Sequence, residues 1–123
     1  MEKEQIQTAD GSHSIFLPEM NEHYHSKHGA IAESQHIFIA KGLREAVKDV
    51  KKVKILEVGM GTGLNVLTSY KAAVGEPWEV EMHTVEAYPL EWQEVKGFNY
   101  TKELELSTTI FQEIHQSSWK SAI

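Results

Sequence analysis

The chain has 123 residues, 41% of them hydrophobic and 24% charged, which is enough for one globular domain with one modest core. It has no cysteine, which excludes a disulfide scaffold and a thiolate zinc site and suits a reducing cytoplasm. The net charge of −6 gives no global attraction for nucleic acid, so an RNA partner would need a local basic patch or another domain. The polar start of the chain lacks a signal-peptide core, and no apolar run approaches the ~18 residues of a membrane span.

The first thirty residues predict a β-hairpin and then a loop. The segments 6–9 and 14–17, read as strands, flank the turn pair Asp10-Gly11. Residues 21–29 are polar and without a period, so they are interpreted as a loop. The loop contains three histidines, but an unpatterned His-x-His-x-x-His without cysteine is a weak metal signal, and we expect no metal site: His23, His25 and His28.

A helix is expected from Ala30 to about Val50. Leu43, Val47 and Val50 fall at the spacing of one buried face. Gly42 costs ~1 kcal/mol relative to alanine, so a kink or two consecutive helices is predicted there. His36 is interpreted as a packed helix residue and not as a catalytic base.

The second half of the chain predicts a strand, a helix and a further strand. Residues 53–58 are a β-branched run, and the following helix has Thr62 as its candidate cap and Gly75 at its end. Residues 79–85 alternate and predict a second strand with one polar side.

Two further helices are expected after the second strand. Pro89 can open a short helix, and Gly97 breaks it. A last amphipathic helix contains Phe111, and His115 and Trp119, four residues apart on one face of it, are interpreted as packing residues. The fold class is therefore α/β.

The turn between the first strand and its helix carries the chemistry. Glu57 is followed by alternating glycines at 59, 61 and 63, which let a backbone approach a ligand closely. The dinucleotide fingerprint Gly-x-Gly-x-x-Gly would put its last glycine at 64, which is Leu64. Glu-x-Gly-x-Gly-x-Gly instead resembles motif I of the Rossmann-like S-adenosylmethionine-dependent methyltransferases. Glu86 ends the second strand, where an acidic residue can accept hydrogen bonds from both ribose hydroxyls.

Further blocks make the resemblance more specific. The Tyr-x-Ser-x-x-Gly-Ala block that starts at Tyr24 and the Glu-Ser pair that starts at Glu33 are rarer than the glycine turn, which many methyltransferases share. In their order, these blocks resemble the methyltransferase module of the MnmC family, the tRNA 5-methylaminomethyl-2-thiouridine biosynthesis enzymes. The blocks are Thr8–Ser12, Tyr24–Ala30, Glu33–Phe38, Leu56–Asn65, Val85–Leu90 and Ile114–Trp119.

The resemblance implies a reaction, a cofactor and partners. The family transfers a methyl group from S-adenosylmethionine to the aminomethyl nitrogen of a modified wobble uridine (5-aminomethyl-2-thiouridine) of tRNA. Many members also carry an FAD-dependent oxidoreductase module, so a partner of that kind is implied, and the setting is cytoplasmic. By resemblance, the cofactor site would be lined from the core by Glu57, Gly59, Gly61, Gly63, Asn65 and Glu86, and closed from the N-terminal segment by Tyr24, Ser26 and Glu33.

The family's module normally continues through further strands, including a segment that borders the methyl acceptor. We therefore expect residues 1–123 to be a single truncated methyltransferase domain, with 1–52 as the hairpin, loop and helical cap and 53–123 as the first part of a partial Rossmann-like core. No catalytic residue is assigned, because the acceptor-side segment is missing. The strand at 53–58 would then have an open apolar edge, which predicts a homodimer or a strand-exchanged oligomer.

Two alternatives stay open at this point. One is a non-catalytic fragment that binds S-adenosylmethionine weakly or only self-associates. The other is a nicotinamide-dependent oxidoreductase, which the early third glycine disfavours.

Overall fold

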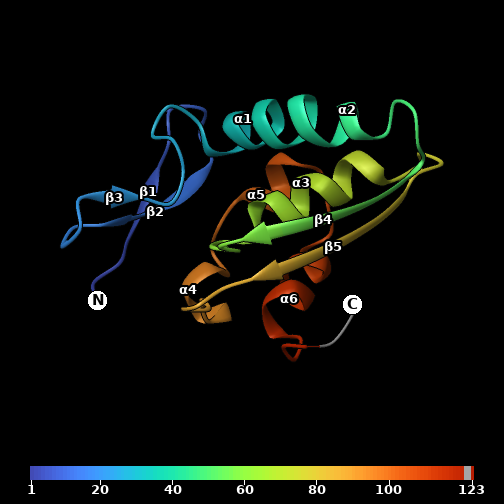
Figure 1. Ribbon diagram of the computed structural model, residues 1–123. Coiled ribbons are helices and arrows are strands. Elements are labelled where there is room, and N and C mark those ends of the chain that lie inside the picture. Colours follow the sequence, from blue (N-terminus) through green and yellow to red (C-terminus); the bar gives the residue numbers. More distant parts are fainter. Residues whose placement is uncertain (121–122) are drawn as a thin grey trace.

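A computed structural model describes residues 1–120 and 123, and it shows a mixed α/β arrangement with two small sheets (Figure 1). The long helical segment α1 to α2 runs alongside the parallel strands β4 and β5, and the sheet β1–β2–β3 lies at one end of that segment. The predicted α/β class, with an N-terminal hairpin and helix ahead of a parallel strand pair, is confirmed.

The N-terminal sheet is antiparallel, in the order β1-β2-β3. Its strands are β1 (Glu4–Gln7), β2 (His13–Leu17) and β3 (Glu22–His23). The predicted hairpin is confirmed, with Ile6 opposite Ser14. The two-residue strand β3 lies where the sequence predicted only a loop, because its pairing with Phe16 and Leu17 depends on the partner strand and not on its own pattern.

The long helical segment comprises α1 (Ala30–Glu33), the π-helix η1 (Ser34–Leu43) and α2 (Arg44–Ala46). The predicted irregularity is present, but as a π-helical stretch that includes Gly42 and not as a kink at that residue. The segment ends at Ala46, so the expectation that it reaches Val50 was wrong; Val50 is 55% exposed. His36 is exposed on η1, which corrects its interpretation as a packed residue.

The N-terminus of α1 is capped by side chains from the β1–β2 turn. Its N-cap residue, Gly29, has no side chain to accept a hydrogen bond, and the first N–H groups of a helix have no partner within the helix. Three side-chain oxygens of the turn take their place: Ala30 N to Thr8 Oγ1 (3.0 Å), Ile31 N to Ser12 Oγ (3.1 Å) and Ala32 N to Asp10 Oδ2 (2.9 Å). The hairpin and the long helix are thereby joined into one unit.

The parallel sheet consists of β4 (Lys52–Val58) and β5 (Glu79–Val85), paired from Lys52 opposite Glu79 to Val58 opposite Val85. Both predicted strands and their parallel pairing are confirmed. One face carries exposed charged residues and the salt bridges Lys52–Glu79 and Lys54–Glu81. The other face contributes Val53, Ile55 and Val80, which pack against the buried residues Ile39, Leu43 and Val47.

Four further helices complete the described fold: α3 (Leu64–Ala73), α4 (Trp92–Val95), α5 (Tyr100–Glu103) and α6 (Thr108–Gln116). Helices α3, α4 and α6 were predicted, whereas α5 was not, because no proline or periodic pattern marks its start. Helix α6 ends at Gln116, so Trp119 lies beyond it, and its 49% exposure corrects its interpretation as a packing residue of that helix. Tyr100 and Phe111 are almost completely buried in the larger core, where ring contacts join α4, α5 and α6. No helix in the described part is both long and apolar enough to cross a membrane.

Candidate functional site

The glycine turn, residues 59–63, connects the end of β4 to the start of α3. Val85 at the end of β5 fixes the first part of the turn, because the Val85 carbonyl oxygen accepts hydrogen bonds from Gly59 N (2.8 Å) and Met60 N (3.1 Å). Gly63 N donates to Met60 O (3.0 Å), which closes the turn on itself. The turn therefore lies at the carboxyl ends of both parallel strands, which is where open α/β sheets bind ligands.

The three glycines of the turn have different surroundings. A Cβ atom on Gly59 would meet no other atom within 4 Å, so this side of the turn is open. A Cβ on Gly61 would lie 3.2 Å from Tyr24 Cδ2, and one on Gly63 would lie 3.1 Å from His115 Nε2. Only the first glycine thus leaves free space for a ligand on its Cβ side, while the other two allow protein side chains to pack closely.

Glu86 follows β5 and holds the turn from beside it. Its Oε1 accepts from Gly61 N (2.8 Å) and its Oε2 accepts from Tyr88 N (3.1 Å). An ionised carboxylate has about four acceptor positions, so each oxygen of Glu86 can accept a further hydrogen bond. Glu86 therefore combines a structural contact with an anionic group at the edge of the turn.

Glu57 and Asn65, both expected in the cofactor site, are hydrogen-bonded to each other. Glu57 is 8% exposed, and its carboxylate accepts from Asn65 Nδ2 (2.9 Å) and Thr84 Oγ1 (2.7 Å). Ser34 of η1 donates to Asn65 Oδ1 (2.7 Å), so the network connects the long helix, both strands and α3. Burial raises the pKa of Glu57, whereas the hydrogen bonds from Thr84 and Asn65 lower it and the nearby Glu86 carboxylate raises it further.

The three expected residues of the N-terminal segment separate into two groups. Tyr24 packs over Gly61, and burial raises the pKa of its hydroxyl. Ser26 and Glu33 contact each other where the loop meets α1, with Ser26 N donating to Glu33 Oε1 (3.3 Å). Tyr24 thus reaches the glycine turn directly, whereas Ser26 and Glu33 are placed to fix the loop that carries it.

Thr62 does not cap α3, which corrects the sequence prediction. The N-cap is Gly63, which has φ 81° and forms no side-chain cap. Thr62 is fully buried: its Oγ1 accepts from Tyr100 OH (3.1 Å) and lies 3.4 Å from His25 Nε2. Its carbonyl oxygen lies 2.8 Å from His115 Nε2.

These three contacts of Thr62 were not predicted from the sequence. They come from 37, 38 and 53 residues away along the chain, so no local pattern identifies them. His25 also lies 2.7 Å from Ser14 Oγ through its Nδ1 atom. Burial lowers the pKa of His25 to about 4, which keeps it neutral near neutral pH.

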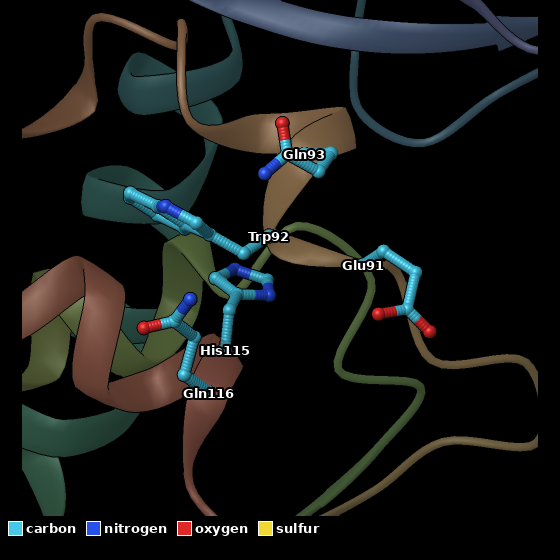
Figure 2. Close-up of a pocket in the computed structure, with 5 residues that line it drawn as sticks. All are labelled: Glu91, Trp92, Gln93, His115 and Gln116. Atoms are coloured by element: carbon cyan, nitrogen blue, oxygen red, sulfur yellow. The ribbon is translucent and has the colours of Figure 1, made fainter.

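Two hollows share His115, and the smaller of them lies against the turn. The smaller has a volume of about 10 Å³, is lined by Gly61, Glu86 and Leu90 among others, and has room for about one water molecule. The larger is an open depression of about 570 Å³ between α4 and α6, where Trp92 and His115 lie next to each other (Figure 2). Gly59 lines neither of these hollows.

Within the described residues, no group of three or more histidine, aspartate or glutamate side chains is placed to hold a metal ion. His25, the middle histidine of the loop, points its two ring nitrogens at Ser14 and Thr62. The polar groups at the turn are backbone N–H groups and carboxylates. Such groups suit hydrogen bonding to a neutral or cationic organic ligand.

Comparisons with known proteins point to one group. No family model matches the chain. The bifunctional proteins MnmC of Burkholderia mallei and Burkholderia pseudomallei, named for tRNA 5-methylaminomethyl-2-thiouridine biosynthesis, are 32% identical to it over 87 residues. The matched part covers 68% of this chain and 13% of theirs.

A solved structure agrees with this relation. MnmC2 of Aquifex aeolicus is 34% identical, with a TM-score of 0.60 over 72% of this chain and 30% of the Aquifex chain. This chain thus spans about an eighth of the curated relatives and under a third of the solved one. Over the part that matches, the chain is related in both sequence and fold to the MnmC proteins.

Proposed function

We propose that this chain provides the cofactor-binding part of an S-adenosylmethionine-dependent methyltransferase that modifies the wobble uridine of tRNA. The observation that carries the proposal is the glycine turn at the ends of β4 and β5, with one open glycine and the Glu86 carboxylate beside it. The relation to MnmC proteins, which are named for tRNA modification, supports the choice of substrate. In this proposal residues 1–52 cover the site and residues 53–123 are the first part of the core.

The residues at the turn fit the adenosyl group of that cofactor. Glu86 has acceptor positions left for the two ribose hydroxyls. The open side of Gly59 leaves room for the ligand to approach the backbone. Glu57 and Asn65 would support the site indirectly, because their mutual hydrogen bond fixes the end of β4 to the start of α3.

When bound, S-adenosylmethionine supplies an electrophilic methyl group on a sulfonium. An amine is already a nucleophile once it is neutral, so the task left to the protein is to place the acceptor nitrogen in line and to give its proton a route away. The acidic residues near the turn, Glu57 and Glu86, favour a cationic sulfonium in that position. An FAD-dependent oxidoreductase that prepares the amine is the implied partner, and the reaction would take place in the cytoplasm with the tRNA.

A second candidate is a non-catalytic chain that self-associates. Within the described residues β4 pairs with β5 alone, so its other edge has free backbone hydrogen-bonding groups. Leu56 and Val58 on that strand are 70% and 81% exposed, which is unusual for a parallel strand. Strand pairing or segment exchange between two copies would cover this edge.

Calorimetry with S-adenosylhomocysteine and with NAD separates these functions. Saturable binding of S-adenosylhomocysteine and none of NAD is the expected result. If neither ligand binds, the result would favour the non-catalytic chain. Binding of NAD alone would contradict the proposal and favour an oxidoreductase.

A further inference from the structure

His115 lies outside the glycine turn in the sequence but directly against it in space. His115 is in the last turn of α6, and the sequence predicted only a packing role for it. Its Nε2 atom lies 2.8 Å from the carbonyl oxygen of Thr62, the residue between the second and third glycines. A carbonyl oxygen can only accept a hydrogen bond, so Nε2 carries the proton and donates.

The packing of α6 also explains why residue 63 is glycine. A Cβ atom there would lie 3.1 Å from His115 Nε2 and 3.3 Å from Ile114 Cγ2, so a side chain would push α6 away from the turn. Gly63 is itself buried, which removes it from the ligand's side. The third glycine of the motif therefore serves the contact with His115, while Gly59 provides the open side.

The surroundings of His115 fix its ring. Phe111 meets it edge-on with 4.9 Å between ring centroids, and Trp92 lies 6.3 Å away on α4, as Figure 2 shows for Trp92 and His115. Burial lowers the pKa of His115, and the carbonyl groups of Thr62 and Leu90 oppose this change. The charged groups that line the same hollows are Glu86 and Glu91.

We propose that His115 is a positioning residue, which holds the glycine turn in its ligand-ready conformation by donating from Nε2 to the Thr62 carbonyl. The inference rests on the proposed cofactor function and adds a residue to it that lies 53 positions from its partner. His115 need not touch the cofactor. It acts by keeping the backbone N–H groups of the turn, and with them Glu86, in one arrangement.

The test compares three variants with the wild type by calorimetry with S-adenosylhomocysteine. His115→Leu keeps a side chain of similar bulk but removes the Nε2–H donor, whereas His115→Gln keeps an amide N–H donor at a similar reach. His36→Leu is the matched control, because it removes an exposed histidine of η1. Loss of one hydrogen bond predicts about tenfold weaker binding for His115→Leu. His115→Gln is expected within about threefold of the wild type, and His36→Leu unchanged. Equal binding by His115→Leu, or a loss with His115→Gln as large as with His115→Leu, would overturn the proposal.

A second measurement does not depend on the cofactor. Nitrogen-15 spectra of the histidine rings should show the His115 proton on Nε2, and His115→Leu should shift the amide signals of Gly61, Thr62 and Gly63 more than His115→Gln does. A proton on Nδ1, or unmoved turn signals in His115→Leu, would reject the positioning role even if the leucine variant binds weakly. If the wild type shows the Nε2 proton but does not bind S-adenosylhomocysteine, the proposed function fails while the contact stands.

Discussion

Thr62 is the residue at which distant parts of the chain meet. His25 from the N-terminal loop, Tyr100 from α5 and His115 from α6 all reach it, and none of its side chain is exposed. Both histidines are partly buried, and this burial lowers the pKa of each. The conformation of the glycine turn therefore depends on two neutral imidazoles.

His25 predicts acid sensitivity. Its pKa in the folded chain is about 4, against the ordinary value of 6.5, so the unfolded chain takes up a proton that the folded chain does not. The neutral His25 side chain contributes roughly 3 kcal/mol to the free energy of unfolding above pH 6.5, and this contribution is lost as the pH falls towards 4. Urea unfolding at pH 7 and pH 4.5 should show a smaller loss in His25→Gln than in the wild type. The exposed His36→Gln is the control, and an identical pH dependence in both variants would contradict the prediction.

Gly59 offers a matched pair with Gly75, which lies beyond α3. Both have positive φ, 89° and 80°, and neither would bring a Cβ atom within 4 Å of another atom. Alanine at either position should therefore cost a similar 1–2 kcal/mol of stability, about the cost of the left-handed conformation. Only Gly59→Ala should also weaken S-adenosylhomocysteine binding, by about tenfold or more, because its Cβ would occupy the open side of the turn. If calorimetry gives equal affinities for the two variants, the ligand does not bind on the Gly59 side of the turn.

At the scale of the elements, the side-chain cap of α1 is the contact that joins the hairpin to the helix. Asp10 is central to it: burial raises the pKa of its carboxyl, but the hydrogen bonds from Ser12, Ala32 and Thr8 together outweigh this and lower it. A Cβ on Gly29 would lie 2.8 Å from Asp10 Oδ2, so the glycine allows the carboxylate to reach the helix. The cap thereby fixes the point where the loop with Tyr24 ends and α1 begins.

Asp10→Ala should lower the free energy of unfolding by about 1–3 kcal/mol, since it removes the acceptor of the Ala32 N–H in α1 and of the Ser12 N–H in the turn. Thermal unfolding followed by circular dichroism measures this. Asp49→Ala, at an exposed position after α2, should change stability by less than about 0.5 kcal/mol. A similar small effect for both variants would mean that the cap contributes little.

The same elements show what the sequence can and cannot reveal. β4, α3 and β5 were predictable because their side-chain periods and turn residues are local. The π-helical hydrogen bonding of η1 leaves no comparable period, and the cap of α1 joins Asp10 to Ala32 across 22 residues. The candidate site is a prediction that rests on the glycines of the turn and on Glu86. The partners of Thr62 were not found, because each belongs to a segment that approaches only in the folded chain.

At the scale of the whole molecule, the unpaired edge of β4 predicts self-association. Sedimentation velocity over a micromolar concentration series should show a concentration-dependent shift from one copy to two. The exposed apolar residues Leu56 and Val58 lie on the same strand, so Leu56→Lys with Val58→Lys should weaken the association. A single monomeric species at all concentrations would exclude it.

In the proposed function, the glycine turn and Glu86 hold the adenosyl group of S-adenosylmethionine. A titration of the nitrogen-15-labelled chain with S-adenosylhomocysteine, followed by amide NMR, tests it at the level of single residues. The predicted result is a saturable change in the signals of Gly59, Gly61 and Glu86, with little change at Gly75. Unchanged spectra at millimolar ligand, or changes confined to positions away from the turn, would contradict it.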